Sequence, residues 1–372
     1  MTVRLSPVLA GLGTYPFVRL EQARARLRAA GVEIIDFGMG EPREETPAFI
    51  RDVLAAAITP LAPYPSAAGL PELRAAIAGW AARRFDVQLD PDTEIVPTLG
   101  SKEAVFSLAN VFDGELVAVP TPSYPVYERG AAFAGKQVVE LPLDDSTWLP
   151  DLAGVDWDRV AILWLNYPNN PTGARAPLAF YERAAELARR HGFVLASDEA
   201  YSELYFAGDP PHSALQVADR ANVAVFNTLS KRSSMPGYRS GFVAGDPEIV
   251  AALRKYRPNV GVAPLELVQR AAIAAWGDER HVDEVRARYR AKRDALLPAL
   301  TSLGLRDAGG DATFFLWMDA GEDADALAAR WLEAGVVVAP GSFFGAPRYL
   351  RIALVPTPED CARAAEIVTG LG

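Results

Sequence analysis

The hydrophobic positions of the chain alternate between two patterns from about residue 94 to residue 244. Short, nearly continuous apolar runs predict strands that are covered on both faces, and amphipathic segments such as Leu178–His191 predict helices between them. The alternation predicts an α/β fold with a mostly parallel seven-stranded sheet. The runs that we assign to strands are Glu94–Thr98, Leu116–Val119, Val138–Leu141, Val160–Leu165, Phe193–Ser197, Ala224–Thr228 and Gly241–Ala244.

The two ends of the chain have a different pattern. Near the start, Leu20–Ala30 predicts an amphipathic helix and Ile34–Phe37 predicts a short strand. From Asp278, which could cap a long helix, strand and helix patterns are mixed. We therefore expect a large domain and a smaller α+β domain that both chain ends build. The expected division of the chain is 1–45, 46–277 and 278–372, of which the first and last parts form the smaller domain.

The composition narrows the classes of partner. The 37 Lys and Arg residues against 47 Asp and Glu residues give a net charge of −10, which disfavours nucleic acid because its binding surfaces are basic. One cysteine, Cys361, excludes an internal disulfide framework, and with three histidines no metal centre is expected. No apolar run reaches the roughly 18 residues of a membrane span, and the start of the chain makes a poor signal peptide. We expect a cytoplasmic protein without membrane, metal or nucleic-acid partners.

Polar side chains gather where three of the predicted strands end. Asn166–Gly173 follows one strand, and Ser197–Tyr201 closes the next. Ser230–Lys231 closes a third strand and leads toward Arg239. Ligands of open α/β sheets bind at the carboxyl ends of the strands, so these segments can converge on one crevice. Together they supply an amine, a carboxylate, a phenol, a carboxamide and a guanidinium, the groups needed to hold pyridoxal phosphate.

In their order and spacing, these motifs resemble those of the class I/II aminotransferases, the fold-type I enzymes that depend on pyridoxal 5′-phosphate. The resemblance runs from about Phe37 to Val355. It implies the fold-type I architecture, transamination, and a homodimer with shared active sites. By position, it implies that Lys231 is the Schiff-base lysine and that Asp198 pairs with the pyridine nitrogen.

The resemblance also assigns the remaining cofactor contacts. Tyr201 and Asn170 match the partners of the ring's phenolate oxygen, and Tyr124 matches the aromatic residue that stacks on the ring. The phosphate contacts that it implies are Thr228, Arg239, the backbone of Ser101 and Lys102 at the start of a helix, and Tyr64 from the neighbouring subunit.

For the substrate, the resemblance implies an arginine that pairs with the α-carboxylate. Arg351 matches it, and Gly40 and Asn170 border the same carboxylate. A second, distal acid would need its own cation, for which Lys102 is our candidate. Arg19 and Arg232 are further candidates.

Each of these residues has an ordinary interpretation when taken alone. A lysine after a strand is usually solvated, and an aspartate there often caps a helix. The sequence Asn-Pro-Thr-Gly is common turn chemistry, and tyrosines more often pack than touch a cofactor. An arginine on a strand more often forms a surface ion pair. We prefer the functional interpretation because all the motifs occur together and in the family's order.

Within the family, four segments (229–237, 241–246, 274–279 and 289–292) resemble the succinyldiaminopimelate transaminases of lysine biosynthesis. This implies glutamate as amino donor and N-succinyl-2-amino-6-oxopimelate as acceptor. The chain departs from the family's usual pattern at Pro42–Pro47, a loop expected at the substrate entrance. A broad-specificity aspartate or aromatic aminotransferase, a β-lyase on the same cofactor, and a non-catalytic aminotransferase-like regulator remain alternatives.

Overall fold

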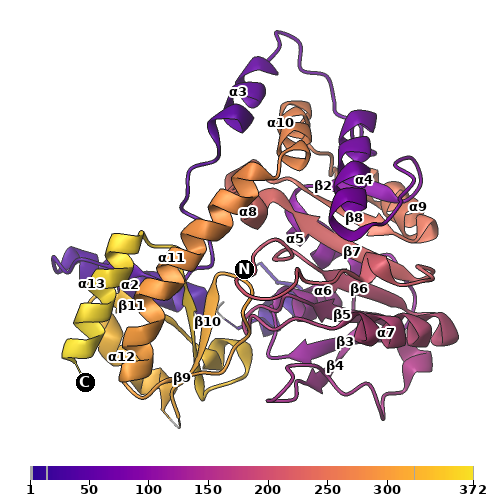
Figure 1. Ribbon diagram of the computed structural model, residues 1–372. Coiled ribbons are helices and arrows are strands. Elements are labelled where there is room, and N and C mark those ends of the chain that lie inside the picture. The colour runs from indigo at the N-terminus through magenta and orange to yellow at the C-terminus, as the bar shows by residue number, and fades with distance from the viewer. Residues whose placement is uncertain (1–2, 14–15, 322, 372) are drawn as a thin grey trace.

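The computed structural model describes residues 3–13, 16–321 and 323–371, and a seven-stranded sheet forms its larger part (Figure 1). The strand order is β2-β8-β7-β6-β5-β3-β4. β8 pairs antiparallel with both of its neighbours, and the other pairs are parallel, as predicted. The strands are β2 (Ile95–Thr98), β3 (Leu116–Thr121), β4 (Gln137–Pro142), β5 (Val160–Asn166), β6 (Val194–Asp198), β7 (Val223–Thr228) and β8 (Gly241–Gly245).

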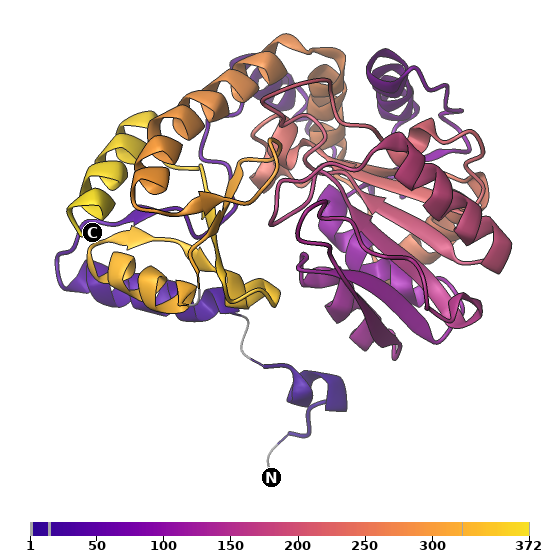
Figure 2. The same ribbon diagram turned by 60° about the horizontal axis from the view of Figure 1, so that its bottom comes forward.

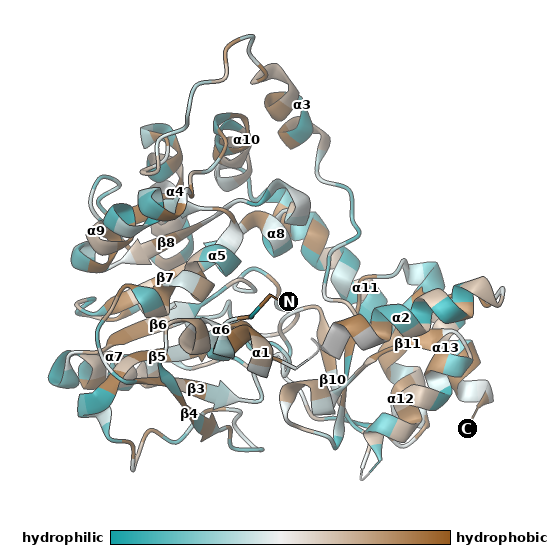
Figure 3. Ribbon diagram, turned by 180° about the vertical axis from the view of Figure 1, so that it is seen from behind, coloured by the Kyte–Doolittle hydropathy of each residue, from teal (hydrophilic) through white to brown (hydrophobic). Residues whose placement is uncertain are grey.

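Helices cover both faces of this sheet, which explains the continuous apolar runs. In β5, Leu163 and Leu165 belong to one apolar cluster, and Ile162 and Trp164 belong to another on the opposite face. Figure 3 shows the hydrophobic residues that make up much of β6 and β7. The first cluster includes α4 (Pro71–Phe85), α7 (Leu178–His191) and α10 (Glu266–Gly277), and the second includes α5 (Gly100–Ser107), α6 (Val126–Phe133) and α9 (Pro247–Tyr256).

The two chain ends build a second, smaller region. The strand β1 (Ile35–Asp36) pairs with β11 (Val336–Val337), about 300 residues later in the chain. An antiparallel sheet lies beside this pair and consists of β9 (Arg306–Asp307), β10 (Phe315–Asp319), β12 (Ala339–Pro340) and β13 (Tyr349–Ala353). The helices here are α2 (Pro16–Ala29), α12 (Ala324–Glu333) and α13 (Pro358–Gly370), with the short α1 (Pro7–Gly11) before them. The exact domain division stays a prediction.

The long helix α11 (Arg280–Ser302) connects the two regions (Figure 2). It begins two residues after Asp278, whose Oδ1 accepts a hydrogen bond of 3.0 Å from the backbone N–H of His281. Glu279 is the residue directly before the helix, but the side chain that caps the helix belongs to Asp278, one position earlier. The remaining α-helices are α3 (Ala48–Ala56) and the single turn α8 (Leu229–Arg232). Among the described residues, no helix is both long and apolar enough to cross a membrane.

Candidate active site

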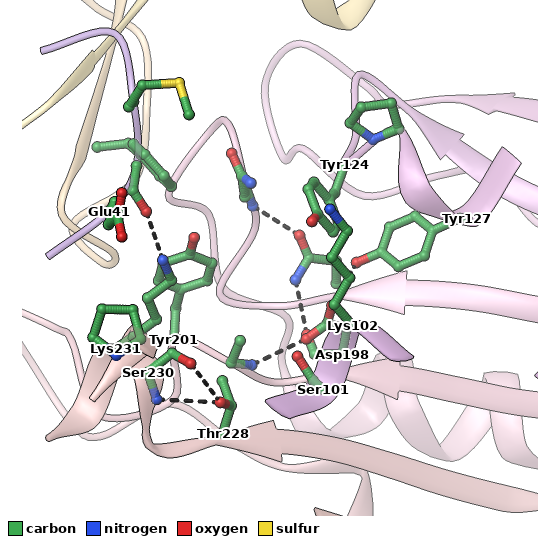
Figure 4. A pocket seen from close by; sticks show the side chains of 18 of the residues that line it. Glu41, Ser101, Lys102, Tyr124, Tyr127, Asp198, Tyr201, Thr228, Ser230 and Lys231 are labelled. Atoms are coloured by element: carbon green, nitrogen blue, oxygen red, sulfur yellow. Dashed lines mark hydrogen bonds between the residues drawn. The ribbon is translucent and has the colours of Figure 1, made fainter. Parts of the chain in front are cut away.

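The carboxyl ends of β5, β6 and β7 open into a cavity of about 320 Å³ (Figure 4). Segments of the smaller region close its other side, including Met39 and Phe315. Such a volume suits a small ligand or cofactor. The structure thus brings together residues that are more than 300 positions apart in the chain. The predicted site residues that line the cavity are Gly40, Ser101, Lys102, Tyr124, Asn170, Asp198, Tyr201, Thr228, Lys231, Arg239 and Arg351.

Lys231 lies on α8, the single helical turn that follows β7. Thr228 caps this turn, because its hydroxyl accepts a hydrogen bond of 3.1 Å from the backbone of Ser230. The Lys231 amine donates to the carbonyl oxygen of Gly40 at 2.5 Å. Burial, together with the positive charge of Arg351, lowers the pKa of the lysine to about 7. Near neutral pH the amine is therefore uncharged in part of the molecules, which is the nucleophilic form.

Asp198 ends β6 on the opposite wall of the cavity and is 4% exposed. Its Oδ2 accepts a hydrogen bond of 2.9 Å from the hydroxyl of Tyr127, and its Oδ1 accepts one of 3.2 Å from the backbone of Ala200. Burial raises the pKa of Asp198 to about 6, and these hydrogen bonds oppose the rise. A protonated ring nitrogen placed beside this carboxylate would stabilise its ionised form further.

The loop after β5 is fixed by side-chain amides. Asn166 donates from Nδ2 to the carbonyl oxygen of Asp198 at 2.8 Å, and its Oδ1 accepts from the backbone of Asn170 at 2.9 Å. Tyr201 stands beside this loop with its ring edge-on to Phe315, and burial raises the pKa of its phenol. The phenol therefore stays protonated and can donate to an oxygen on a bound ring.

At the end of the cavity beside the start of α5, Ser101, Lys102 and Arg239 form a site suited to an anion, which we call the anion cradle. Gly100, the first residue of α5, has φ +66°, and a Cβ atom there would come within 2.5 Å of Arg239 Nη2. The absence of that atom lets the guanidinium lie across the start of the helix, where it donates to the carbonyl oxygen of Leu99 at 3.2 Å. Burial and the nearby charge of Arg239 lower the pKa of Lys102. Concentrated positive charge beside a helix N-terminus suits a phosphate.

The hydroxyl groups at this end of the cavity form hydrogen bonds within the protein. Thr228 Oγ1 donates to the carbonyl oxygen of Ser240 at 2.8 Å and lies 2.9 Å from Ser230 Oγ. Binding of phosphate by Thr228 would require its hydroxyl to turn toward the cavity. Ser230 lines the same end of the cavity, although the sequence motifs gave it no role.

Arg351 enters from β13 on the side of the smaller region. Its guanidinium donates to Asn170 Oδ1 at 3.0 Å and to the carbonyl oxygen of Gly38 at 2.8 Å. The rings of Phe315 and Phe344 lie 4.4 and 4.7 Å from it. A guanidinium held in this way presents a planar fork to a carboxylate.

Two predicted residues, Tyr64 and Arg232, do not line the cavity. Tyr64 is fully exposed and does not line it. The prediction that Arg232 serves a distal acid is wrong, because its guanidinium is buried and pairs with Glu279 at 2.7 Å. Of the side chain of Arg19 nothing is described, so that prediction lies outside the described residues.

Several residues that line the cavity were not predicted from the sequence. Tyr127 lies three residues after Tyr124, and Asn166 is the first residue of the segment Asn166–Gly173, so both had a signal in the chain. Glu41, Phe315 and Phe344 had none, because they come from distant segments that meet only in the folded chain.

The donor set fits one cofactor. An amine of lowered pKa, a buried carboxylate opposite it and a cradle for a dianion are what pyridoxal phosphate requires. These features and the fold define a pyridoxal-phosphate enzyme of the α/β class. Residues 32–368 match the model of the family "Aminotransferase class I and II", and the chain belongs to that family. The protein is a pyridoxal-phosphate-dependent aminotransferase, which confirms the predicted fold, cofactor and enzyme class.

Similar proteins carry more specific names. The chain is 38% identical over 385 residues to the LL-diaminopimelate aminotransferase of Nitratidesulfovibrio vulgaris, with 99% of each chain covered. Its structure is similar to an aminotransferase from Neisseria meningitidis, with a TM-score of 0.91, 37% identity and coverage of 99% of this chain and 100% of that chain. It is also similar to a probable N-succinyldiaminopimelate aminotransferase of Thermus thermophilus, with a TM-score of 0.87, 30% identity and coverage of 95% and 99%.

Proposed function

We propose that the protein transfers an amino group between glutamate and a diaminopimelate-type substrate, as a step of lysine biosynthesis. The observation that carries this proposal is the placement of the Lys231 amine and the Arg351 fork in one cavity. A substrate whose α-carboxylate is bound by Arg351 presents its α-carbon to that amine.

When bound, pyridoxal phosphate supplies an electron-accepting ring. Lys231 would hold the group covalently, and its amine, when free, would carry a proton to and from the substrate α-carbon. Asp198, held by Tyr127, would keep a ring nitrogen protonated. Tyr201 and Asn170 would bind the ring's phenolate oxygen, and Tyr124 would lie against the ring. The backbone of Ser101 and Lys102, together with Thr228 and Arg239, would hold the phosphate, which leaves the Lys102 side chain for the substrate.

The substrate class rests on resemblance and on charge. The segments quoted above favour N-succinyl-2-amino-6-oxopimelate as acceptor, and the name of the Nitratidesulfovibrio relative favours LL-diaminopimelate, whose distal amino group is free. Both candidates carry a second acid several carbons from the α-carboxylate. Lys102 lines the same cavity as Arg351, and we assign its side chain to that distal acid.

We also propose that the working unit is a homodimer. A largely apolar hollow of about 420 Å³ lies between α3 and α10 and shares Arg239 with the active-site cavity. Around α3 and α10, Ile58, Leu61, Tyr64 and Leu265 are exposed by 56% or more. A second copy seated there would bury these side chains and bring its Tyr64 toward Arg239 and the phosphate. A cytoplasmic location remains a prediction.

The proposal is tested with a panel of amino acceptors and glutamate as donor. The panel contains N-succinyl-2-amino-6-oxopimelate, 2-amino-6-oxopimelate without the succinyl group, oxaloacetate and phenylpyruvate. We expect kcat/KM for one of the first two to exceed the others at least tenfold. Equal or better use of oxaloacetate or phenylpyruvate would identify a broad-specificity aspartate or aromatic aminotransferase. Failure of glutamate to convert the bound cofactor to its amino form would overturn the assignment of glutamate as the donor.

A further inference from the structure

The two residues that follow Lys231 are both buried and both bind the junction between α10 and α11. Arg232 donates to the carbonyl oxygen of Ala275 at 2.7 Å and lies over the ring of Trp276 at 4.9 Å. Ser233 is 0% exposed, and its hydroxyl oxygen lies 2.8 Å from Nε2 of His281. The turn that carries the lysine is therefore joined to the helix that leads into the smaller region.

Ser233, His281 and Asp278 form one hydrogen-bonded chain. His281 Nδ1 lies 2.8 Å from Asp278 Oδ1, which also accepts the backbone N–H of His281. Although its partial burial opposes this, hydrogen bonds from His281 hold the pKa of Asp278 below its ordinary value. An ionised Asp278 can only accept, so Nδ1 carries the proton. In the neutral ring Nε2 then accepts, and the Ser233 hydroxyl donates to it.

The imidazole is held from several elements. It is 3% exposed, and Phe49 of α3 meets its ring edge-on at 5.6 Å. The charged groups around it are Asp278, Arg232 and Glu284, and burial lowers its pKa in spite of the hydrogen bond to Asp278. The neutral form, with a single defined tautomer, is therefore the form present at neutral pH.

This chain of hydrogen bonds holds one end of the turn that carries the lysine. At its start, Thr228 accepts from the backbone of Ser230. At its end, the backbone N–H of Ser233 donates to the carbonyl oxygen of Leu229 at 3.0 Å, and the Ser233 side chain is held by His281. With one turn of helix between them, these two ends fix the backbone of Lys231.

We propose that His281, through Ser233, is a positioning residue for Lys231, so that the start of α11 and the reactive amine are set by one hydrogen-bonded unit. A buried polar pair that served packing alone could be replaced by apolar side chains at little loss. Here the hydrogen bond between Ser233 and His281 sets the orientation of α8. A movement of α11 relative to the seven-stranded sheet would therefore move Lys231. The inference rests on the proposed role of Lys231 and does not depend on which substrate is used.

The test uses Ser233→Ala, His281→Gln and the double variant. A matched control is His191→Gln, which removes an imidazole that is likewise paired with an aspartate, Asp158, at 2.7 Å, but near the surface at the end of α7. The measurements are kcat and KM, the melting temperature, and the rate at which an amine reagent labels Lys231 in the cofactor-free protein as a function of pH. Borohydride reduction of the holoenzyme followed by peptide mass spectrometry first locates the lysine that carries the cofactor.

We expect each single variant to lower kcat about tenfold with little change in KM and to change the labelling rate of Lys231 at least threefold. The double variant should be no worse than either single variant, because the residues act as one unit. A fall in melting temperature with unchanged labelling and kcat would overturn the inference and leave the proposed function intact. Attachment of the cofactor to another lysine would instead overturn the proposed role of Lys231. Should His281→Gln fail to fold, Ser233→Ala, which removes one oxygen atom, decides alone.

Discussion

The hydroxyl of Tyr127 donates a hydrogen bond of 2.9 Å to Oδ2 of Asp198, and both side chains are buried beside the cavity. The ring of Tyr127 is itself stacked on Trp164 at 4.7 Å, so the phenol cannot swing away without disturbing the core. The hydrogen bond from Tyr127 therefore orients the Asp198 carboxylate, which we assign to the ring nitrogen of the cofactor.

Tyr127→Phe should raise the pKa of Asp198 further and weaken its hold on the ring nitrogen. A hydrogen bond to a charged group contributes about 1.5–3 kcal/mol. We expect cofactor affinity and kcat each to fall roughly tenfold or more, measured by absorbance titration and steady-state kinetics. Tyr181→Phe, which removes another buried phenol, serves as the control, and equal losses in the two variants would contradict the role of Tyr127.

The lowered pKa of Lys231 predicts how stability depends on pH in the cofactor-free protein. In the unfolded chain the lysine keeps its ordinary pKa of about 10.4, whereas the folded value is about 7. Between these two values the unfolded state binds more protons, so stability should rise with pH across this window. Lys231→Met lacks this contribution. The difference in melting temperature, wild type minus Lys231→Met, should therefore become more positive from pH 7 to pH 9. A constant difference would argue against a perturbed amine.

Gly100→Ala should separate backbone strain from loss of the anion cradle. A side chain at φ +66° costs about 1–2 kcal/mol, and its Cβ would also displace the Arg239 guanidinium. Gly135→Ala is the matched control, because Gly135 has φ +72° with nothing within 4 Å of an added Cβ. Both variants should lose stability in chemical denaturation, and only Gly100→Ala should weaken cofactor binding. Equal cofactor affinities would show that the cradle tolerates the added atom.

Lys102→Ala tests the assignment of the distal acid. The loss of one charge-assisted hydrogen bond costs about 1.5–3 kcal/mol, or roughly ten- to a hundredfold in specificity. We expect that loss for glutamate and little change for alanine, judged by the ratio of their kcat/KM values in the variant and the wild type. The same loss with both donors would place Lys102 at the phosphate or in the fold.

Hybrid dimers test whether Tyr64 serves the site of the neighbouring subunit. One subunit carries Tyr64→Phe and the other Lys231→Ala, and the hybrid is purified through two different tags. If Tyr64 reaches across, one site combines an intact Lys231 with an intact Tyr64, and its cofactor affinity should equal that of the wild type. If Tyr64 acts within its own subunit, no site is intact and the hybrid should show only the weakened affinity of Tyr64→Phe.

Much of the seven-stranded sheet could be predicted because the apolar pattern of each strand is visible within a few consecutive residues. A strand covered on both faces must be apolar at successive positions, so β5, β6 and β7 stand out in the chain without any knowledge of their partners. The polar residues that follow them were found for the same reason, since parallel strands end at one edge of the sheet. The resemblance to a family then supplied roles for Lys231 and Asp198 that spacing alone did not give.

What the sequence could not decide depends on which distant segments meet. An arginine in a local pattern is only a cation, yet folding places Arg351 between two phenylalanine rings at the cavity and buries Arg232 against Glu279. Likewise, nothing near His281 in the chain points to Ser233, 48 residues earlier. The sequence determined the fold class, the cofactor chemistry and the order of the motifs. The tertiary structure decided which charges face the cavity and which are neutralised inside the protein, because burial and pairing depend on contacts between segments that no local pattern encodes.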